Sequence, residues 1–169
     1  SRNHRDTHLL DRGEWDRPAK AVKPHTPAAF PEFPADAPRD RLGFARWLTD
    51  PRAPLTARVA VNRVWQAIFG TGLVETSEDF GTRAPVPEYL ELLDWLAVDF
   101  MEHGWSQKHL IRTIVTSRTY QQSSKGTPEL WANDPRNQWL ARGPSFRADA
   151  EVMRDIALSV SGLITQKLG

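Results

Sequence analysis

Residues 54–69 constrain the fold more than any other stretch of this chain. Apolar residues recur there every three or four positions, while Arg58, Asn62 and Gln66 occupy successive turns of the opposite face, with Arg63 beside them. A run of this length with one apolar side predicts a helix that packs against other helices. A glycine at position 70 predicts where that helix ends. The predicted apolar stripe consists of Ala57, Ala60, Val61, Val64, Trp65 and Ile68.

The same helical period continues through most of the chain after residue 39, and no segment alternates with period two for long enough to predict a strand. The sequence therefore predicts an all-α fold, a compact bundle-like domain of about five helices. The four other helices are expected near residues 40–49, 87–103, 106–119 and 146–163. The expected buried residues are Leu42, Ala45, Trp47 and Leu48 in the first of these, and Val152, Met153, Ile156, Ala157, Val160 and Ile164 in the last.

The first 38 residues differ in composition from the rest. They contain six of the 13 prolines, and proline lacks an N–H donor and pushes the preceding residue toward extended geometry. We expect residues 1–38 to form a polyproline-like extended segment that docks on a helical domain formed by residues 39–169. The apolar side chains available for docking are Leu9, Leu10, Trp15, Phe30 and Phe33.

Composition narrows the classes of protein that fit. With 169 residues and 40% apolar content, the chain is long enough for one domain with its own core. Its 22 Lys and Arg residues against 21 Asp and Glu residues predict a nearly neutral surface, which argues against a nucleic-acid partner. The absence of cysteine excludes disulfides, thiolate metal sites and covalent haem attachment within the chain. No apolar run reaches the roughly 18 residues that a membrane span requires.

Several separated motifs, taken in order, resemble one family. They are RLGFARWL at 41–48, the 54–72 run, EDFG at 78–81, ELLDWLA at 91–97, GWS at 104–106, IVTS at 114–117 followed by Thr119 and Tyr120, and the stretch 147–162. From about Arg12 to its last residue, the chain resembles the planctomycete-type C-terminal domain of unknown function. That domain accompanies planctomycete cytochrome c domains in large exported proteins.

The resemblance implies an architecture rather than a reaction. It implies an accessory or interaction module of an exported, periplasmic or cell-surface protein, whose partners are sibling domains of the same polypeptide, including a cytochrome c domain. Haem c is implied for upstream domains of the parent protein, and no cofactor for this chain. Since the chain begins at Ser1 without an export signal and the family domain normally continues beyond Gly169, we expect a fragment in which part of the last helix lacks its packing partners.

The polar row formed by Arg58, Asn62, Arg63 and Gln66 has two interpretations. The planar paired donors of the arginines could clamp a carboxylate, a haem propionate or a sugar acid. Alternatively, the row holds the 70–86 loop by hydrogen bonds to its carbonyl groups. We favour the second interpretation, because polar groups under a long loop would otherwise be buried without partners.

The candidate acidic residues have similar alternatives. Arg147, Glu151 and Asp155 are spaced four apart, with Arg154 adjacent, so their carboxylates could serve acid–base chemistry or bind a divalent cation. The arginines favour a salt-bridge ladder instead. Asp79 lies in a glycine-bounded loop and could be a catalytic carboxylate, although a loop aspartate more often caps a turn.

Aromatic and histidine residues complete the candidates. The hydroxyls of Ser117 and Tyr120 have no histidine near them in sequence to act as a base. The five histidines are not expected to form a metal site, because His4 and His8 lack a third ligand, and His103 and His109 flank a helix break. The tryptophans divide into expected core residues (Trp47, Trp65, Trp95) and surface candidates for stacking on a sugar or a neighbouring domain (Trp131, Trp139).

Two other functions remain open. Part of a polysaccharide-processing enzyme would depend on the carboxylates of Asp79, Glu151 and Asp155 together with the tryptophans. A helical nucleic-acid-binding module would depend on Arg112 and Arg118 with Arg58 and Arg63, although the near-zero net charge argues against it. No residue is assigned as catalytic, and catalytic activity of the chain by itself is not expected.

Overall fold

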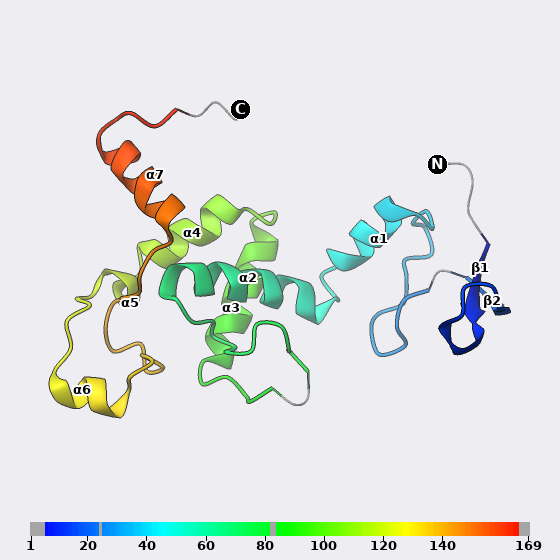
Figure 1. The fold of residues 1–169 in the computed structure, drawn as a ribbon, viewed down its shortest axis with the longest axis horizontal. Helices are drawn as coiled ribbons and strands as arrows, with labels where there is room; N and C mark the ends of the chain where they lie inside the picture. Colours follow the sequence, from blue (N-terminus) through cyan, green and yellow to red (C-terminus); the bar gives the residue numbers. More distant parts are fainter. Residues whose placement is uncertain (1–5, 24, 82–83, 166–169) are drawn as a thin grey trace. The chain divides into compact units, whose positions relative to one another are not determined.

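The computed structural model describes residues 6–23, 25–81 and 84–165 (Figure 1). The described part contains seven α-helices and one two-stranded sheet, which confirms the prediction of a largely helical fold. No helix of the described part is long and apolar enough to cross a membrane. The chain divides into two compact units, Ser1–Thr56 and Ala57–Gly169, and each is described by itself.

The first unit contains an antiparallel hairpin that the sequence analysis did not predict. Strand β1, Thr7–Leu10, pairs with β2, Pro18–Val22, and a short 3-10 turn η1 at Asp11–Gly13 follows β1. The expectation of a continuous polyproline-like segment is therefore wrong for these residues. The strands were missed because nearly all their side chains are exposed, so they carry no alternation of buried and exposed positions.

Helix α1, Arg41–Leu48, begins where predicted, since the Asp40 carboxylate accepts hydrogen bonds from the N–H groups of Leu42 and Gly43. Its buried face differs from the prediction. Gly43 and Trp47 are buried, whereas Leu42 and Ala45 are exposed.

The proline-rich segment explains that choice of face. The Trp47 indole N–H donates to the carbonyl of Pro31 over 2.8 Å, and the ring of Phe30 meets the indole edge to face. A Cβ on Gly43 would lie only 1.8 Å from the carbonyl oxygen of Pro38. Residues 30–38 therefore pack on the side of α1 that carries Gly43, where the absence of a side chain lets their backbone approach the helix closely.

The core of the second unit is formed by helices α2, Pro54–Phe69, α3, Leu90–Glu102, and α4, Gln107–Val115. Positive φ angles at Gly70 (87°) and Gly104 (64°) end α2 and separate α3 from α4, as the glycine positions predicted. The buried apolar side chains of these helices and of the loop after α2 are Ala57, Val61, Trp65, Val74, Leu93, Leu96, Ala97, Phe100, Leu110 and Ile114.

Three local predictions differ from the structure. The predicted fourth helix is divided, because Ser117 caps a separate helix α5, Arg118–Gln121. Helix α6, Pro128–Asn133, lies in the predicted 121–135 loop and is too short to show an apolar period, although Thr127 and Pro128 form a typical helix start. Trp95 is 56% exposed rather than buried, because it lies on the outer side of α3.

Helix α7, Ala150–Val160, is shorter than the predicted 146–163 helix. The expectation that its apolar face lies in the core is wrong in this structure, since Val152, Met153, Ile156 and Val160 are all exposed. The face has the predicted spacing, but none of the described residues covers it.

Candidate functional site

Asn62 of α2 holds the following loop in place. Its side chain is fully buried, its Oδ1 accepts from the Val74 N–H over 2.8 Å, and its Nδ2 donates to the Val74 carbonyl over 3.0 Å. The Ser77 hydroxyl in the same loop donates to Gln66 Oε1 over 2.7 Å. A Cβ on Gly72 would lie 2.6 Å from Asn62 Nδ2, so this loop requires glycine there. These contacts confirm the loop-holding interpretation for Asn62 and Gln66.

Arg58 points elsewhere. Its Nε donates to Asp94 Oδ1 over 2.6 Å, which joins α2 to α3. This hydrogen bond lowers the pKa of Asp94 and raises that of Arg58. Arg63 is exposed. The four residues of the polar row therefore do not converge on one ligand: two hold the loop, one holds α3 and one faces solvent.

A second ordered loop, residues 134–142, is organised by two buried charged residues. The Asp134 carboxylate accepts from the N–H groups of Gln138 and Trp139 over 2.7 and 2.9 Å. The Arg142 guanidinium donates to the carbonyls of Asp134 and Pro135 and lies 3.9 Å from the ring centre of Trp131. Its Nη1 is buried without a partner among the described residues, which is a position suited to a bound water.

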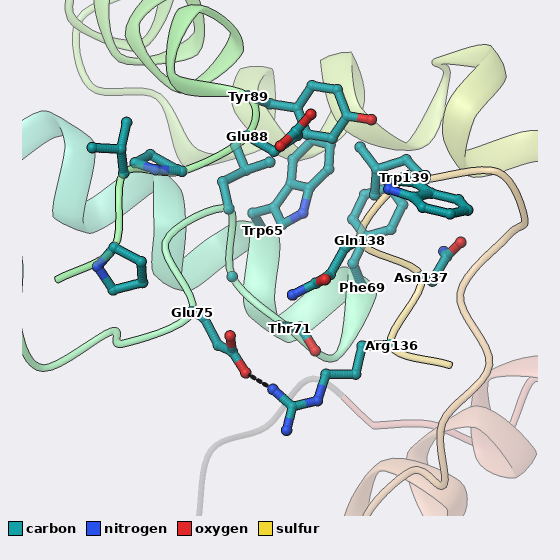
Figure 2. A pocket seen from close by; sticks show the side chains of 16 residues that line it. Trp65, Phe69, Thr71, Glu75, Glu88, Tyr89, Arg136, Asn137, Gln138 and Trp139 are labelled. Atoms are coloured by element: carbon teal, nitrogen blue, oxygen red, sulfur yellow. Dashed lines mark hydrogen bonds and ion pairs between the residues drawn. The ribbon is translucent and has the colours of Figure 1, made fainter. Parts of the chain in front are cut away.

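These two loops and α2 line an open pocket of about 260 Å³ (Figure 2). Its floor is the stacked pair Trp65 and Phe69, whose ring centres are 4.2 Å apart. Residues 85–89, which lead into α3, form one wall, and residues 136–140 form another. An ion pair between Glu75 and Arg136 connects the 70–81 loop to the 134–142 loop at one end.

The lining of the pocket combines aromatic rings with hydrogen-bonding groups. Trp139, 55% exposed, and Tyr89 contribute rings at its edge, and Figure 2 shows the amide of Gln138 directed toward its interior. The side chains of Glu88 and Gln138 make no hydrogen bond or ion pair with the part of the chain that the structure describes. Rings beside open carboxylate and amide groups suit a small ligand that has both a flat apolar face and hydroxyls.

Of the ligand, interface and stacking candidates predicted from the sequence, Trp139 alone lines this pocket. Asn62 and Gln66 shape it by holding a wall, and the Tyr120 ring packs edge-on against Phe69 at 5.9 Å. The Asp79 carboxylate accepts from the Gly81 N–H, the turn-capping role that the sequence favoured. Trp139 was predicted as a surface aromatic, whereas Glu88 and Gln138 had no local signal.

The predicted salt-bridge ladder on the last helix does not form. Helix α7 begins at Ala150, so Arg147 lies outside it. The four-residue spacing of Arg147 and Glu151 therefore does not place their side chains one helical turn apart. Within the described part of the chain, the ion pair of this group is Arg154 with Asp155, 3.4 Å apart and largely exposed. Such a pair contributes little to stability.

Two of the five histidines do come together, although the sequence analysis did not expect the histidines to form a metal site. Asp99, His103 and His109 come together where α3 meets α4, with one potential ligand atom from each within 4.8 Å of the others. Sequence reasoning missed Asp99. The available signal was its spacing of four residues before His103, combined with the glycine that reverses the chain before His109.

The comparisons with known proteins give one match. A family model described as PSD1, protein of unknown function (DUF1553), matches residues 40–169. No curated protein and no solved structure matches the chain significantly.

Proposed function

The chain belongs to the PSD1 family of proteins of unknown function (DUF1553), and from that premise we propose that it is a helical accessory or interaction module of a larger protein. In this proposal the module packs on sibling domains of the same polypeptide through the apolar face of α7. The parent protein is exported to the periplasm or cell surface and carries haem c in an upstream domain.

The observation that carries the proposal is the exposed apolar face of α7, formed by Val152, Met153, Ile156 and Val160. These side chains are between 48% and 86% exposed, and Leu163 and Ile164 continue the patch beyond the helix. An 11-residue helix is marginal in water without tertiary contacts. A contiguous apolar helix face of this kind marks a surface that another chain segment covers.

The resemblance supports the choice of occupant. Its motifs extend through residues 147–162, so α7 belongs to the part of the chain that resembles the C-terminal domain of exported cytochrome-bearing proteins. A sibling domain is present at high effective concentration, and a modest apolar patch is then sufficient for stable docking.

The test compares two double variants in binding to the separately produced upstream region of the parent polypeptide. Met153→Gln with Ile156→Gln should weaken docking at least about tenfold, since two buried apolar side chains are lost. Glu151→Gln with Arg154→Gln, on the opposite side of the same helix, should leave it nearly unchanged. Calorimetry gives both affinities.

Equal affinity of the two double variants, or no docking of the unmodified chain, would contradict the proposal. The haem and export components are tested separately. The reading frame upstream of Ser1 should encode an export signal and a Cys-x-x-Cys-His motif, and the purified parent should show a c-type haem spectrum. A parent without haem would refute the cytochrome context alone.

A second candidate function, carbohydrate binding, is favoured by the pocket. Trp139 and Tyr89 offer ring faces on which a sugar could stack, and Glu88 and Gln138 offer acceptors and a donor for its hydroxyls. This candidate preserves the alternative of a polysaccharide-processing role, with Glu88 in place of Asp79, Glu151 and Asp155 as the carboxylate to examine.

Oligosaccharides from xylan, laminarin and alginate are the probes for this candidate. Trp139→Ala should weaken binding about tenfold through loss of stacking, whereas Trp15→Ala, an exposed tryptophan of the first unit, should not change it. Failure of all three probes to bind, or equal binding by both variants, would count against the pocket as a sugar site. If the chain releases reducing ends from one of these probes and Glu88→Gln abolishes that release, the pocket also has catalytic activity.

A further inference from the structure

The structure brings three metal-ligating side chains together at the junction of α3 and α4, outside the pocket. We propose that Asp99, His103 and His109 form a binding site for a divalent transition-metal ion of the zinc class. Imidazole nitrogens with one carboxylate oxygen are a donor set that such ions prefer over calcium or magnesium.

Backbone geometry fixes the three residues in place. Asp99 and His103 are one helical turn apart at the end of α3, so both side chains project from the same side. Positive φ angles at Gly104 (64°) and Trp105 (60°) reverse the chain. Ser106 then caps α4 by accepting from the N–H of His109, which places His109 in the first turn beside the end of α3.

The junction between α3 and α4 is attached to the core by Trp105. The backbone N–H of Trp105 donates to the backbone carbonyl of Phe100 over 2.9 Å, and the centres of the two aromatic rings are 5.3 Å apart. Phe100 is part of the buried core. The reversal that brings His109 to Asp99 is therefore anchored in the core rather than left to a free loop.

The side chains are already close to ligating positions. His109 Nε2 lies 2.8 Å from Asp99 Oδ2, and His103 Nδ1 lies 3.2 Å from Asp99 Oδ1. The two imidazole rings are stacked 3.7 Å apart and nearly parallel. Bonds of about 2.0–2.2 Å to a tetrahedral ion need ligand atoms that are somewhat closer than 4.8 Å and rings that splay. Side-chain rotation supplies both changes, and binding also releases the proton that His103 Nδ1 donates to the Asp99 carbonyl and the proton between His109 Nε2 and the Asp99 carboxylate.

Partial exposure leaves room for a fourth ligand. The side chains of Asp99, His109 and His103 are 16%, 33% and 49% exposed, so the carboxylate is the most enclosed ligand and the histidines border solvent. Three protein ligands with an open position accessible to water are typical of a zinc site that can exchange or activate a ligand. Thr113 Oγ1, 3.5 Å from His109 Nε2, lies next to the site and can support that histidine.

The alternative role is a purely structural clamp, in which Asp99 ties the two histidines and the two helices together. His103 already contacts its own helix, with Nδ1 2.8 Å from the Asp99 carbonyl oxygen, so a clamp between helices needs only His109. The metal site accounts for both imidazoles facing one carboxylate. The two roles differ in a measurable way, because only the metal site binds an ion.

The test is titration of the full chain with Zn²⁺ by calorimetry and with Co²⁺ by visible absorption. We expect one ion per chain, with Co²⁺ bands of a four-coordinate site that Zn²⁺ abolishes. His103→Ala and His109→Ala should each weaken binding at least about tenfold. His8→Ala, an exposed histidine of β1, is the matched control and should bind as the unmodified chain does.

A second readout guards against a folding defect in the variants. Zn²⁺ should raise the thermal unfolding midpoint of the unmodified chain, because an ion that binds only the folded state stabilises it, and Asp99→Asn should remove most of that rise while keeping the helical circular dichroism. The proposal is overturned if Zn²⁺ does not bind. It is equally overturned if the double variant His103→Ala with His109→Ala binds Zn²⁺ as well as the unmodified chain.

Discussion

At the scale of the residue, Asn62 shows how one buried amide decides the shape of a loop. An asparagine in the middle of a helix is ordinarily unfavourable, yet here both of its amide atoms satisfy the N–H and carbonyl of Val74. Those backbone groups are buried and would otherwise lack partners. Since the 70–81 loop forms part of the pocket wall, the pocket depends on a residue that does not line it.

Asn62→Ala should therefore destabilise the chain by about 3 kcal/mol, since it leaves two buried backbone groups of Val74 unpaired. Gln66→Ala removes one hydrogen bond from the Ser77 hydroxyl, which keeps its contact with Asn62 Nδ2, and should cost about 1 kcal/mol. Urea unfolding followed by tryptophan fluorescence measures both. Equal losses would show that the Val74 contacts do not dominate.

At the scale of the element, the Arg58–Asp94 pair connects α2 to α3 and makes their association depend on pH. The hydrogen bond from Arg58 holds the pKa of Asp94 below its ordinary value of 3.8. The folded-state pKa is depressed, so the stabilisation is present above the unfolded-state pKa and is lost as pH falls through the folded-state pKa. The Asp94 side chain is 40% exposed, so solvent screening limits the effect.

The free energy of unfolding should consequently decrease as pH is lowered below about 4, and Asp94→Asn should remove up to about 1 kcal/mol of that decrease. The free energy of unfolding of the unmodified chain and of Asp94→Asn is measured at pH 7 and at pH 3. Asp50, whose pKa is lowered to about 2 by hydrogen bonds from Arg52, supplies a separate contribution, so Asp50→Asn is measured in parallel. An unchanged pH dependence in Asp94→Asn would exclude a stabilising pair.

Also at this scale, α7 has a helical sequence but no buried side chain in the described structure. Its amide hydrogens should exchange far faster than those of α2 and α3 in the isolated chain, because only tertiary burial protects a helix of this length. Hydrogen–deuterium exchange with mass spectrometry resolves the helices. Equal protection of α7 and α2 would mean that something already covers the apolar face.

At the scale of the whole molecule, stability is concentrated in the core of the second unit. Leu110 on α4 is fully buried among side chains of α2 and α3, whereas Ile156 on α7 is half exposed. Leu110→Ala should cost about 3 kcal/mol of unfolding free energy, through lost burial and the cavity left behind. Ile156→Ala, the control, should cost less than about 0.5 kcal/mol in the isolated chain. A large loss for Ile156→Ala would show that α7 packs in solution.

The sequence by itself determined the helices of the core, because their signals are local. The spacing of Ala57, Val61 and Trp65, the glycines after α2 and α3, and the cap at Ser106 all act within a few residues of the element that they define. It also predicted the role of Asn62 and Gln66, since a polar row beside a long loop has few other partners to satisfy.

Tertiary structure alone decided which apolar faces are covered and which distant side chains meet. Leu42, Trp95 and Ile156 are as apolar as their buried neighbours, and only the presence or absence of a packing partner separates them. The pocket requires two loops, one held by Asn62 and the other by Asp134 and Arg142. The contact between Asp99 and His109 requires the chain reversal at Gly104. The period of a segment specifies which side of its helix is apolar. Whether that side is buried depends also on the surface that packs against it, and the sequence of the segment does not describe that second surface.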